Sequence, residues 1–419
     1  MNGKRMASGT GRRTFLKQIA GGTGVVVSQA LLSPQKILGA NNRVRLGLIG
    51  AGDRGTEIFK VALRCPNTEA VAAADVYRHR LDAIKRVAPR LKCYTDFRHL
   101  LDDKTIDAVL IATPQHQHAL NFVPAIQAGK DVYQEKTMAF SPDHARKMRR
   151  AYESSGRVVQ VGVQSTSGPG FAEARRLATR ERMGVITLIH AHHYRNAPYG
   201  GWKRHIPADC DPQHVDWSAF QGEAKRHEFS SERVINWRFY WDYSGGNVFE
   251  NMVHQVGFWY KVLDLPIPLQ VTMTGGNFLS PRMEPPDTMD VSMRLENMLF
   301  TWSSAFGNHH YGETDDVVGG TKGTLLRNQE GEVRYVPEGK GATAEDEQAK
   351  ASSGGTAGYG DAAETRAHMQ NFMDCVRSRK QPNCHFEIGF RSAIVCQMAV
   401  ASYRRDRTVR WDGSREEIV

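Results

Sequence analysis

The sequence predicts an α/β fold whose N-terminal part is a doubly wound parallel sheet of the Rossmann type. Three observations support this prediction. First, a nearly all-apolar run, VRLGLIG, leads directly into a glycine-rich turn at residues 50–55, as expected for a central parallel strand. Second, apolar runs and amphipathic segments then alternate as far as residue 164. Third, 419 residues are too many for one ordinary domain and predict two.

The glycine-rich turn follows the G-x-G-x-x-G pattern and predicts a dinucleotide-binding site. Gly50 permits the tight turn, Gly52 lets the backbone approach a pyrophosphate, and Gly55 lets the next helix pack on the sheet. That helix is expected to begin near Asp53 and to direct its N-terminus at the phosphates. The turn alone is weak evidence, but the strand before it, the helix after it and a second strand, EAVAAAD, make the prediction specific. The residues expected to bind the cofactor here are Gly50, Ala51, Gly52, Asp53, Arg54 and Gly55.

The second predicted strand ends in Asp75, twenty residues after Gly55. A carboxylate at this position can accept hydrogen bonds from both ribose hydroxyls of adenosine, and it repels a 2′-phosphate. We therefore expect NAD as the cofactor in preference to NADP. The alternative is a solvated loop aspartate, and the basic residues at 78–80 would soften the preference for NAD.

Polar side chains mark the ends of the later strands of the predicted sheet. The fourth strand is expected at 106–113, the fifth in KDVYQEK and the sixth in VVQVGVQ. In such sheets ligands bind at the carboxyl ends of the strands, and strand packing gives no reason for two histidines or a Glu-Lys pair there. We therefore predict further cofactor contacts from Thr113, Pro114, His116, His118, Glu135, Lys136 and Gln164.

These segments resemble the glucose–fructose oxidoreductase/inositol dehydrogenase (Gfo/Idh/MocA) family. The resemblance lies in GLIGAGDRG, ATPQHQHA and AGKDVYQEKTM, and later in GGNVFENMVH and FEIGFRSAIVCQMAVASYRRDRTVRWD. It implies a Rossmann domain at 41–164 and a C-terminal α+β domain at 165–419 built on a large, mostly antiparallel sheet. It also implies an oxidoreductase that binds NAD or NADP and acts on sugars or polyols.

The family's Glu-Lys-Pro motif corresponds to Glu135, Lys136 and Thr137, so threonine replaces the proline. The resemblance implies that Lys136 lies near both the nicotinamide and the substrate hydroxyl. An ammonium group there can stabilise an oxygen that develops negative charge, or relay its proton. The alternative for an isolated lysine is a solvated side chain, which the position at a strand end argues against.

A second motif of the family, G-G-x-x-x-D-x-G-x-H, corresponds to residues 245–254. His254 matches the histidine, whereas Glu250 replaces the aspartate and Met252 the last glycine. A helical period places Glu250 and His254 on one face, four residues apart. The histidine suits the role of base for a substrate hydroxyl, and the alternative is a core histidine paired with Glu250. We predict Lys136, His254 and Glu250 as catalytic, and the two departures suggest an altered substrate or reaction.

The remaining C-terminal sequence predicts a strand in GVITLIHAHHYRN, with His190 and His192 on one face and His193 on the other. No carboxylate or cysteine is spaced to complete a metal site with them, so no metal is predicted. Aromatic residues crowd residues 202–243, where they suit a sugar site or, equally, a core or a subunit interface. Residues 338–361 lack apolar periodicity and predict a flexible loop or a lid. Further strands are expected at 269–278, 289–303 and 314–327, and helices at 362–378 and 388–404.

Residues 1–40 resemble a bacterial twin-arginine signal peptide for export. Adjacent arginines at 12 and 13 precede Phe-Leu-Lys, a weak apolar run and small residues near position 40. The alternative is a disordered basic tail. The apolar run is too short and too weak to span a bilayer stably. We therefore expect an exported, periplasmic protein without stable membrane insertion.

The formal net charge of +10 is concentrated in this N-terminal segment, which carries six basic residues and no acidic one. The rest of the chain is only mildly basic and gives no reason to expect a nucleic-acid partner. The six cysteines form no C-x-x-C pair and predict buried thiols; a disulfide between Cys375 and Cys384 is the alternative in an oxidising compartment.

Export of a dinucleotide-binding protein raises a supply problem, because free NAD is not expected to be replenished outside the cytoplasm. A tightly held cofactor that is restored in each catalytic cycle avoids it. Three functions fit: an oxidoreductase whose NAD is reoxidised by a second substrate, a glycosidase or lyase that works by transient oxidation and elimination, and a non-catalytic sugar-binding protein that keeps NAD. An open antiparallel sheet also suits a homo-oligomer.

Overall fold

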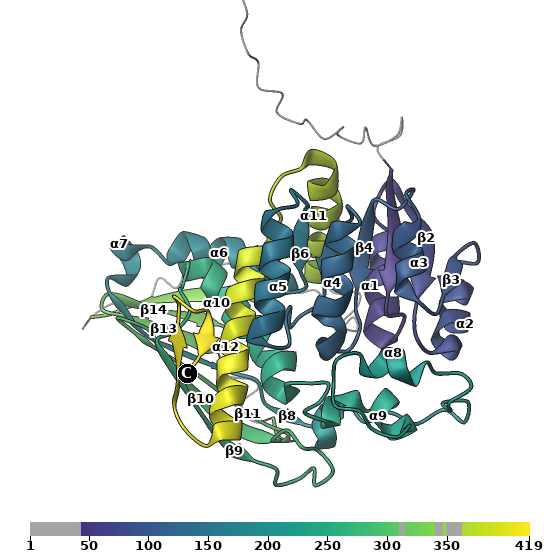
Figure 1. Cartoon of the computed structure of the whole chain (residues 1–419). Coiled ribbons are helices and arrows are strands. Elements are labelled where there is room, and N and C mark those ends of the chain that lie inside the picture. The colour runs from purple at the N-terminus through teal and green to yellow at the C-terminus, as the bar shows by residue number, and fades with distance from the viewer. Residues whose placement is uncertain (1–42, 310–314, 340–346, 349–362) are drawn as a thin grey trace, which may run out of the picture. The chain divides into compact units, whose positions relative to one another are not determined.

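The computed structural model describes residues 43–309, 315–339, 347–348 and 363–419 (Figure 1). The predicted signal peptide at 1–40 lies outside these residues, as does most of the predicted loop at 338–361. Within that loop, Glu347–Gln348 form a short edge strand, β16, because they pair with the preceding strand of a sheet. In the described part of the chain, no helix is long and apolar enough to cross a membrane.

The N-terminal sheet is parallel and doubly wound, which confirms the predicted Rossmann-type fold. Its strand order is β3-β2-β1-β4-β5-β6. Successive side chains of a strand point to opposite faces, and those of β1 divide accordingly: Leu46 and Leu48 join one hydrophobic cluster and Ile49 joins another. Both faces of the sheet are therefore covered. The strands are β1 (Val44–Ile49), β2 (Thr68–Ala74), β3 (Lys92–Tyr94), β4 (Ala108–Ile111), β5 (Asp131–Gln134) and β6 (Val159–Val161).

The helices that cover this sheet come from both ends of the chain. The C-terminal helix α11 (Ala363–Ser378) packs beside α1, and its Met369, Phe372 and Met373 belong to the same buried cluster as Leu46 of β1. The N-terminal sheet is thus completed by residues from beyond position 165. The other covering helices are α1 (Asp53–Leu63), α2 (Arg78–Val87), α3 (Phe97–Asp102), α4 (His118–Gln127) and α5 (Pro142–Glu153).

The second sheet has ten strands in the order β16-β15-β14-β13-β7-β11-β10-β9-β17-β18. Only the β7–β11 pair is parallel among these described strands, which confirms the expected large, mostly antiparallel sheet. The predicted strand at 289–303 is instead a hairpin, because β10 pairs with β11 along their whole lengths. The strands are β7 (Ile186–His192), β9 (Gln270–Gly276), β10 (Thr288–Arg294), β11 (Leu299–Ala305), β13 (Asp316–Gly320), β14 (Gly323–Arg327), β15 (Val333–Pro337), β17 (Val409–Asp412) and β18 (Glu417–Ile418).

The predicted strand at 184–196 is interrupted after His192. The next short strand, β8 (Arg195–Asn196), leaves the large sheet and pairs with β12 (Gly307–Asn308) in a two-stranded sheet of its own. Within β7, Ile189 and Ala191 are buried while His190 is exposed, so the predicted alternation of faces holds. The predicted strand at 314–327 likewise divides into β13 and β14.

Helix α12 (Phe386–Arg405) connects the two sheets, since it contacts β9 of the large sheet and β6 and α5 of the parallel sheet. A Cβ on Gly389 would lie 2.4 Å from a Val161 methyl carbon, so only glycine allows this approach to β6. Helix α10 (Val253–Leu263) packs against α12, and a π-helical turn, η5 (Val248–Met252), precedes it. Shorter helices on the same side of the large sheet are η2 (Gln164–Ser167), α6 (Pro169–Leu177) and α7 (Arg180–Met183).

A segment of the C-terminal region, residues 198–243, packs back onto the end of β2 and the start of α2. Tyr77 forms an antiparallel bridge with Val215, and Asp216 N donates to Val76 O at 2.9 Å. We call residues 198–243 the insertion segment; in Figure 1 its helices α8 and α9 are drawn below α1 and to the left of α2. Its helices are η3 (Pro198–Gly201), α8 (Trp217–Gln221), α9 (Ser231–Ile235) and η4 (Trp237–Phe239).

The aromatic residues of the insertion segment form a small core of their own. Tyr243 is fully buried and Trp237 nearly so, and both pack in one cluster with Tyr77, Phe220 and Val234. These residues therefore support the core interpretation of the aromatic-rich stretch rather than an open sugar platform. All six cysteines are free thiols, five of them buried, so the alternative disulfide between Cys375 and Cys384 is not formed.

The close packing of α1 on the sheet gives a stability prediction. A Cβ on Gly55 would lie 1.9 Å from Gly50 O, so Gly55→Ala forces the turn and the helix apart. We expect the free energy of unfolding to fall by about 3 kcal/mol. Gly319→Ala is the matched control, because its added Cβ would meet only Leu188 Cβ at 3.7 Å. Thermal unfolding of both variants measures the difference; equal melting temperatures would contradict this account of the turn.

Candidate active site

The glycine turn has the geometry that a dinucleotide pyrophosphate requires. Gly50 has a φ of +91°, a backbone conformation that favours glycine. Gly52 is the N-cap of α1, and no side chain caps this helix. The amide groups of its first turn are therefore left to bind an external anion. These features fit NAD, which the predicted residues 50–55 would hold by its phosphates.

Asp75 lies beside this turn, where the ribose of a bound dinucleotide would be recognised. It is 7% exposed; its Oδ2 accepts a hydrogen bond from Ala51 N at 2.7 Å and its Oδ1 accepts one from Tyr77 N at 2.9 Å. Each oxygen keeps a second lone pair that a ribose hydroxyl can use. Arg80 Nη1 is 3.9 Å from Oδ2, and a Cβ on Gly52 would meet the Arg80 guanidinium at 3.6 Å. The carboxylate is therefore fixed by the protein rather than solvated.

The histidines that follow β4 bind main-chain carbonyl groups of the protein. His116 Nε2 is 2.7 Å from Phe220 O in the insertion segment, and burial lowers the pKa of His116 to about 4. His118 lies 2.7 Å from Thr137 O and 3.0 Å from Thr113 O. These side chains hold the strand-end loops together. Contacts of Thr113, Pro114, His116 or His118 with a cofactor stay predictions.

Arg54 joins the glycine turn to the end of β5. Its Nε donates to Glu135 Oε1 at 2.9 Å, and its Nη1 donates to Glu57 at 2.9 Å. Burial opposes the charge of Arg54, but Glu135 and its other acidic neighbours keep its pKa raised. Gln164 donates to Tyr133 Oη at 2.8 Å and reaches Glu135 Oε1 at 3.4 Å. The Arg54–Glu135 ion pair thus places Lys136, the residue after Glu135, near the glycine turn.

Glu250 stands at the centre of the site, between two cations. Its Oε2 accepts from Lys136 Nζ at 2.5 Å, and its Oε1 accepts from Arg238 Nε at 3.0 Å and from Gln115 Nε2 at 2.9 Å. Burial by itself would raise the pKa of Glu250, but Arg238 and Lys136 lower it to about 2. The Glu250 carboxylate is therefore ionised at every physiological pH, and it fixes the Lys136 ammonium at the strand end.

His254 lies within the electrostatic reach of the same groups. Burial lowers its pKa well below the ordinary value, the positive charges of Lys136 and Arg54 lower it further, and Glu250 opposes them. The imidazole is therefore neutral and able to accept a proton. The structure brings His254 and Glu250 together as the sequence predicts, but their spacing is not purely α-helical, because residues 248–252 form the π-helical turn.

Sequence reasoning missed two groups that contact Glu250. Gln115 is 1% exposed and directly precedes His116, so its position at a strand end was the available signal. Arg238 lies in the aromatic-rich insertion segment, 123 residues after Gln115 in sequence, and nothing local marks it. His193 lies within electrostatic reach of His254, and burial lowers its own pKa to about 3, with Arg195 and Lys136 adding to the shift.

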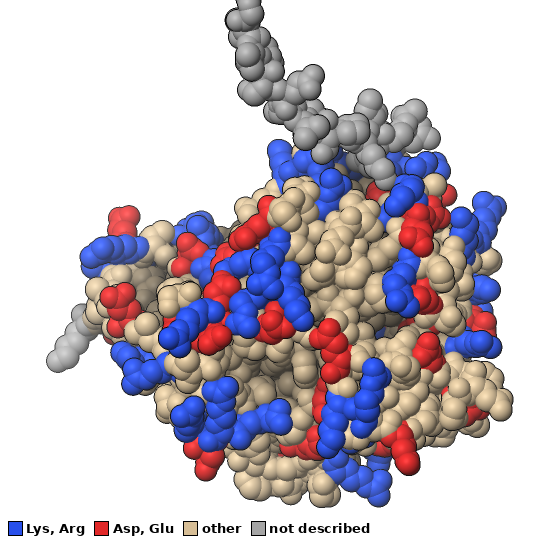
Figure 2. Space-filling model, viewed as in Figure 1, with Lys and Arg blue, Asp and Glu red and all other residues tan. Residues whose placement is uncertain are grey.

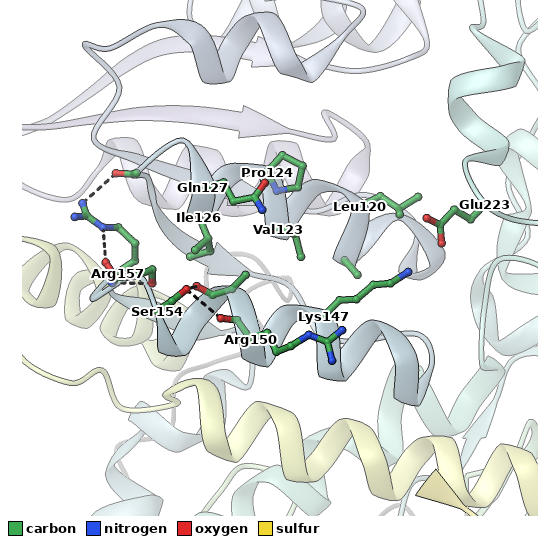
Figure 3. A pocket seen from close by; sticks show the side chains of 14 residues that line it. Leu120, Val123, Pro124, Ile126, Gln127, Lys147, Arg150, Ser154, Arg157 and Glu223 are labelled. Atoms are coloured by element: carbon green, nitrogen blue, oxygen red, sulfur yellow. Dashed lines mark hydrogen bonds between the residues drawn. The ribbon is translucent and has the colours of Figure 1, made fainter. Parts of the chain in front are cut away.

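No metal centre accompanies these groups in the part of the chain that the structure describes, since it brings no three of its His, Cys, Asp or Glu residues together around an ion. A groove of about 770 Å³ lies elsewhere, between α4 and α5 (Figure 3). It has an apolar floor that includes Val123 and Ile126, and basic rim residues such as Lys147 and Arg150. None of the predicted site residues lines this groove. Acidic side chains intersperse with the basic ones over this face (Figure 2), and Lys147 Nζ pairs with Asp143 at 2.9 Å.

The charges around His254 give a prediction about its ionisation. An ordinary histidine titrates near pH 6.5; because the pKa of His254 is lowered, its ring stays neutral as the pH falls through that value. NMR titration of labelled histidine, assigned with His254→Asn, measures this. Lys136→Met removes a positive charge and should raise the pKa of His254, whereas Lys92→Met, at an exposed pair with Asp103, should leave it unchanged. A wild-type midpoint at or above pH 6.5 would contradict the prediction.

Sequence comparison agrees with this geometry. The profile described as "Oxidoreductase family, NAD-binding Rossmann fold" matches residues 44–163, and the profile described as "Oxidoreductase family, C-terminal alpha/beta domain" matches residues 214–410. Inositol 2-dehydrogenase of Salmonella typhimurium is 27% identical over 154 residues, which are 36% of this chain and 46% of that protein. The chain thus spans about half the length of that relative.

Two further relatives extend over more of the chain. A 2,7-anhydro-N-acetylneuraminate hydratase of Mediterraneibacter gnavus is 24% identical over 290 residues, covering 67% of this chain and 66% of that protein. A solved structure of levoglucosan dehydrogenase with NADH and levoglucosan has a TM-score of 0.67 and 18% identity, covers 88% of this chain and 99% of that one, and shows the shared fold. Together, the two family profiles match more than half of the residues of the chain. The chain therefore belongs to the Gfo/Idh/MocA family of oxidoreductases and has an NAD-binding Rossmann domain.

Proposed function

We propose that this protein oxidises a hydroxyl group of a sugar or polyol with NAD that it holds tightly and recycles internally. One observation carries the proposal: the Lys136–Glu250 pair lies at the strand end that Arg54 and Glu135 connect to the glycine turn, and the neutral His254 is within electrostatic reach of Lys136, Arg54 and Glu250. A dinucleotide that binds at the turn with its phosphates can extend its redox ring toward this pair.

The residues of the site divide the chemistry between them. The neutral imidazole of His254 accepts the proton of the substrate hydroxyl. The Lys136 ammonium stabilises the negative charge that develops on the same oxygen, and Glu250 positions that ammonium through the 2.5 Å contact. When bound, NAD takes the two electrons that leave the carbon as a hydride. The inositol and levoglucosan dehydrogenases among the relatives support a carbohydrate hydroxyl as the target.

Retention of the cofactor is supported by the insertion segment. Arg204 Nε lies 3.2 Å from Asp53 Oδ2 at the first residue of α1, so this segment reaches across to the glycine turn. Asp209 accepts a hydrogen bond from Tyr77 Oη at 2.6 Å and lies 2.8 Å from His79 Nδ1. A dinucleotide bound beside Asp75 would be enclosed between the parallel sheet and this segment, which slows its release.

The predicted export of the protein also favours a cofactor that is retained and recycled. We propose that residues 1–40 direct the folded protein through the twin-arginine pathway to the periplasm, where a released cofactor would not be replaced. A second substrate would then restore NAD in place. A homo-oligomer, formed through the second sheet, completes the proposal.

A redox-neutral glycosidase or hydratase is the second candidate, and one observation favours it. A relative that matches over two thirds of this chain is a hydratase of an anhydro sugar. The same base and ammonium suit a cycle in which a hydroxyl is oxidised, the acidified neighbouring C–H is deprotonated, a C–O bond breaks, water adds and the ketone is reduced again.

Incubation of the purified protein with glycosides, without added NAD, distinguishes the two. We expect reduction of the bound nicotinamide that stops after one turnover, seen by its absorbance. Released monosaccharide with no net absorbance change would instead support the redox-neutral cycle. Neither outcome, in a protein that carries NAD, would support a non-catalytic binding protein. Lys136→Ala and His254→Ala should abolish the reaction yet retain bound NAD, with Lys92→Ala as the control; full activity in either variant would refute that residue's role.

A separate measurement addresses retention. The double variant Arg204→Ala/Asp209→Ala removes the ion pair with Asp53 and the side-chain contacts with Tyr77 and His79, so the cofactor should be lost severalfold faster on dialysis. Arg98→Gln, which removes an exposed arginine of α3 paired only with Asp96, should not change the rate. An unchanged rate in the double variant would show that the insertion segment does not retain the cofactor.

A further inference from the structure

Glu250 is one carboxylate shared by two cations, Lys136 and Arg238. The neighbouring cation Arg54 pairs with two carboxylates, Glu135 and Glu57. Three cations therefore meet three carboxylates, and the hydrogen-bonding groups that stay unused, rather than a net charge, indicate what else the site can bind.

Arg238 has hydrogen-bonding groups that its contacts within the described residues leave unused. Its Nε donates to Glu250, and its guanidinium lies 4.2 Å from the centre of the Trp237 ring, so two contacts fix its orientation. Its side chain is 27% exposed. Neither terminal amino group, Nη1 nor Nη2, donates a hydrogen bond to any described residue. A fixed guanidinium with two free amino groups matches the two oxygens of a carboxylate.

The two other roles open to Arg238 are already filled. Its Nε already serves to hold Glu250, together with Lys136 and Gln115. The ammonium of Lys136 already stabilises an oxygen that becomes negative during the proposed reaction. The two terminal amino groups of Arg238 are therefore left to bind a part of the substrate that does not react.

We infer that the substrate is an acidic sugar, such as a uronic or aldonic acid, whose carboxylate is bound by the terminal amino groups of Arg238. This inference rests on the proposed function, because it names the substrate class of the same site. It makes Arg238 the residue that determines specificity, separate from the proton-accepting His254.

The test compares acids with neutral counterparts of the same size on the full chain carrying its cofactor. The probes are methyl glucuronide against methyl glucoside, galacturonate against galactose, and gluconate against glucitol. We expect at least one acid to bind about tenfold or more tightly than its counterpart by calorimetry, as removal of a charge-assisted hydrogen bond would predict. Arg238→Gln should abolish this preference, read as the ratio of acid to neutral affinity within each variant, and Arg238→Lys should restore part of it.

Arg98→Gln controls for the loss of one positive charge elsewhere and should keep the preference. The inference is overturned if no acid binds better than its neutral counterpart, or if the preference survives in Arg238→Gln. Binding and nicotinamide reduction are measured separately, so a failure of the redox proposal can be distinguished from a failure of this inference. In that case acids bind preferentially to the wild type, lose the preference in Arg238→Gln, and leave the nicotinamide unchanged.

Discussion

The site depends on one buried carboxylate, Glu250, held between Lys136 and Arg238. Each partner comes from a different part of the fold: Lys136 from the end of a parallel strand, Arg238 from the insertion segment, and Glu250 from the π-helical turn before α10. A buried charge is tolerated only when it is paired and hydrogen-bonded. Three elements far apart in sequence must therefore assemble correctly before Glu250 can be buried, and the same contacts that satisfy it orient the ammonium and keep His254 neutral.

A second ion pair, between Arg54 and Glu135, couples this centre to the glycine turn. It explains why adjacent residues of one strand end have different duties. Glu135 pairs with Arg54 of the glycine turn, whereas Lys136 pairs with Glu250. The substitution of proline by Thr137 also has a role in this arrangement, since Thr137 Oγ1 donates to Phe249 O at 2.7 Å. That hydrogen bond, which proline could not make, ties the strand end directly to the turn that carries Glu250.

The insertion segment adds contacts that join the end of the parallel sheet to the site. It supplies Arg238 to the site, fixes His116 through Phe220 O, and contacts both the glycine turn and the end of β2. The histidines at 116 and 118 therefore have structural partners, although their place at strand ends suggested ligands. Because their imidazoles contact main-chain carbonyls of the protein, they connect the loops at the strand ends with each other and with the insertion segment.

The sequence by itself determined the parallel sheet, the glycine turn with Asp75, and the large antiparallel sheet through its family resemblance. It also singled out Lys136, Glu250 and His254, whose catalytic roles stay predictions. These features are local: strand periodicity, glycine spacing and short motifs are written in neighbouring residues. Only the tertiary structure decided that Gln115 and Arg238 contact Glu250, that α11 completes the first sheet, and that residues 202–243 form a core of their own beside Tyr77. Those contacts join residues separated by tens to hundreds of positions, and no periodicity or spacing records them, because they arise only when separate elements pack together and must satisfy one another's charges.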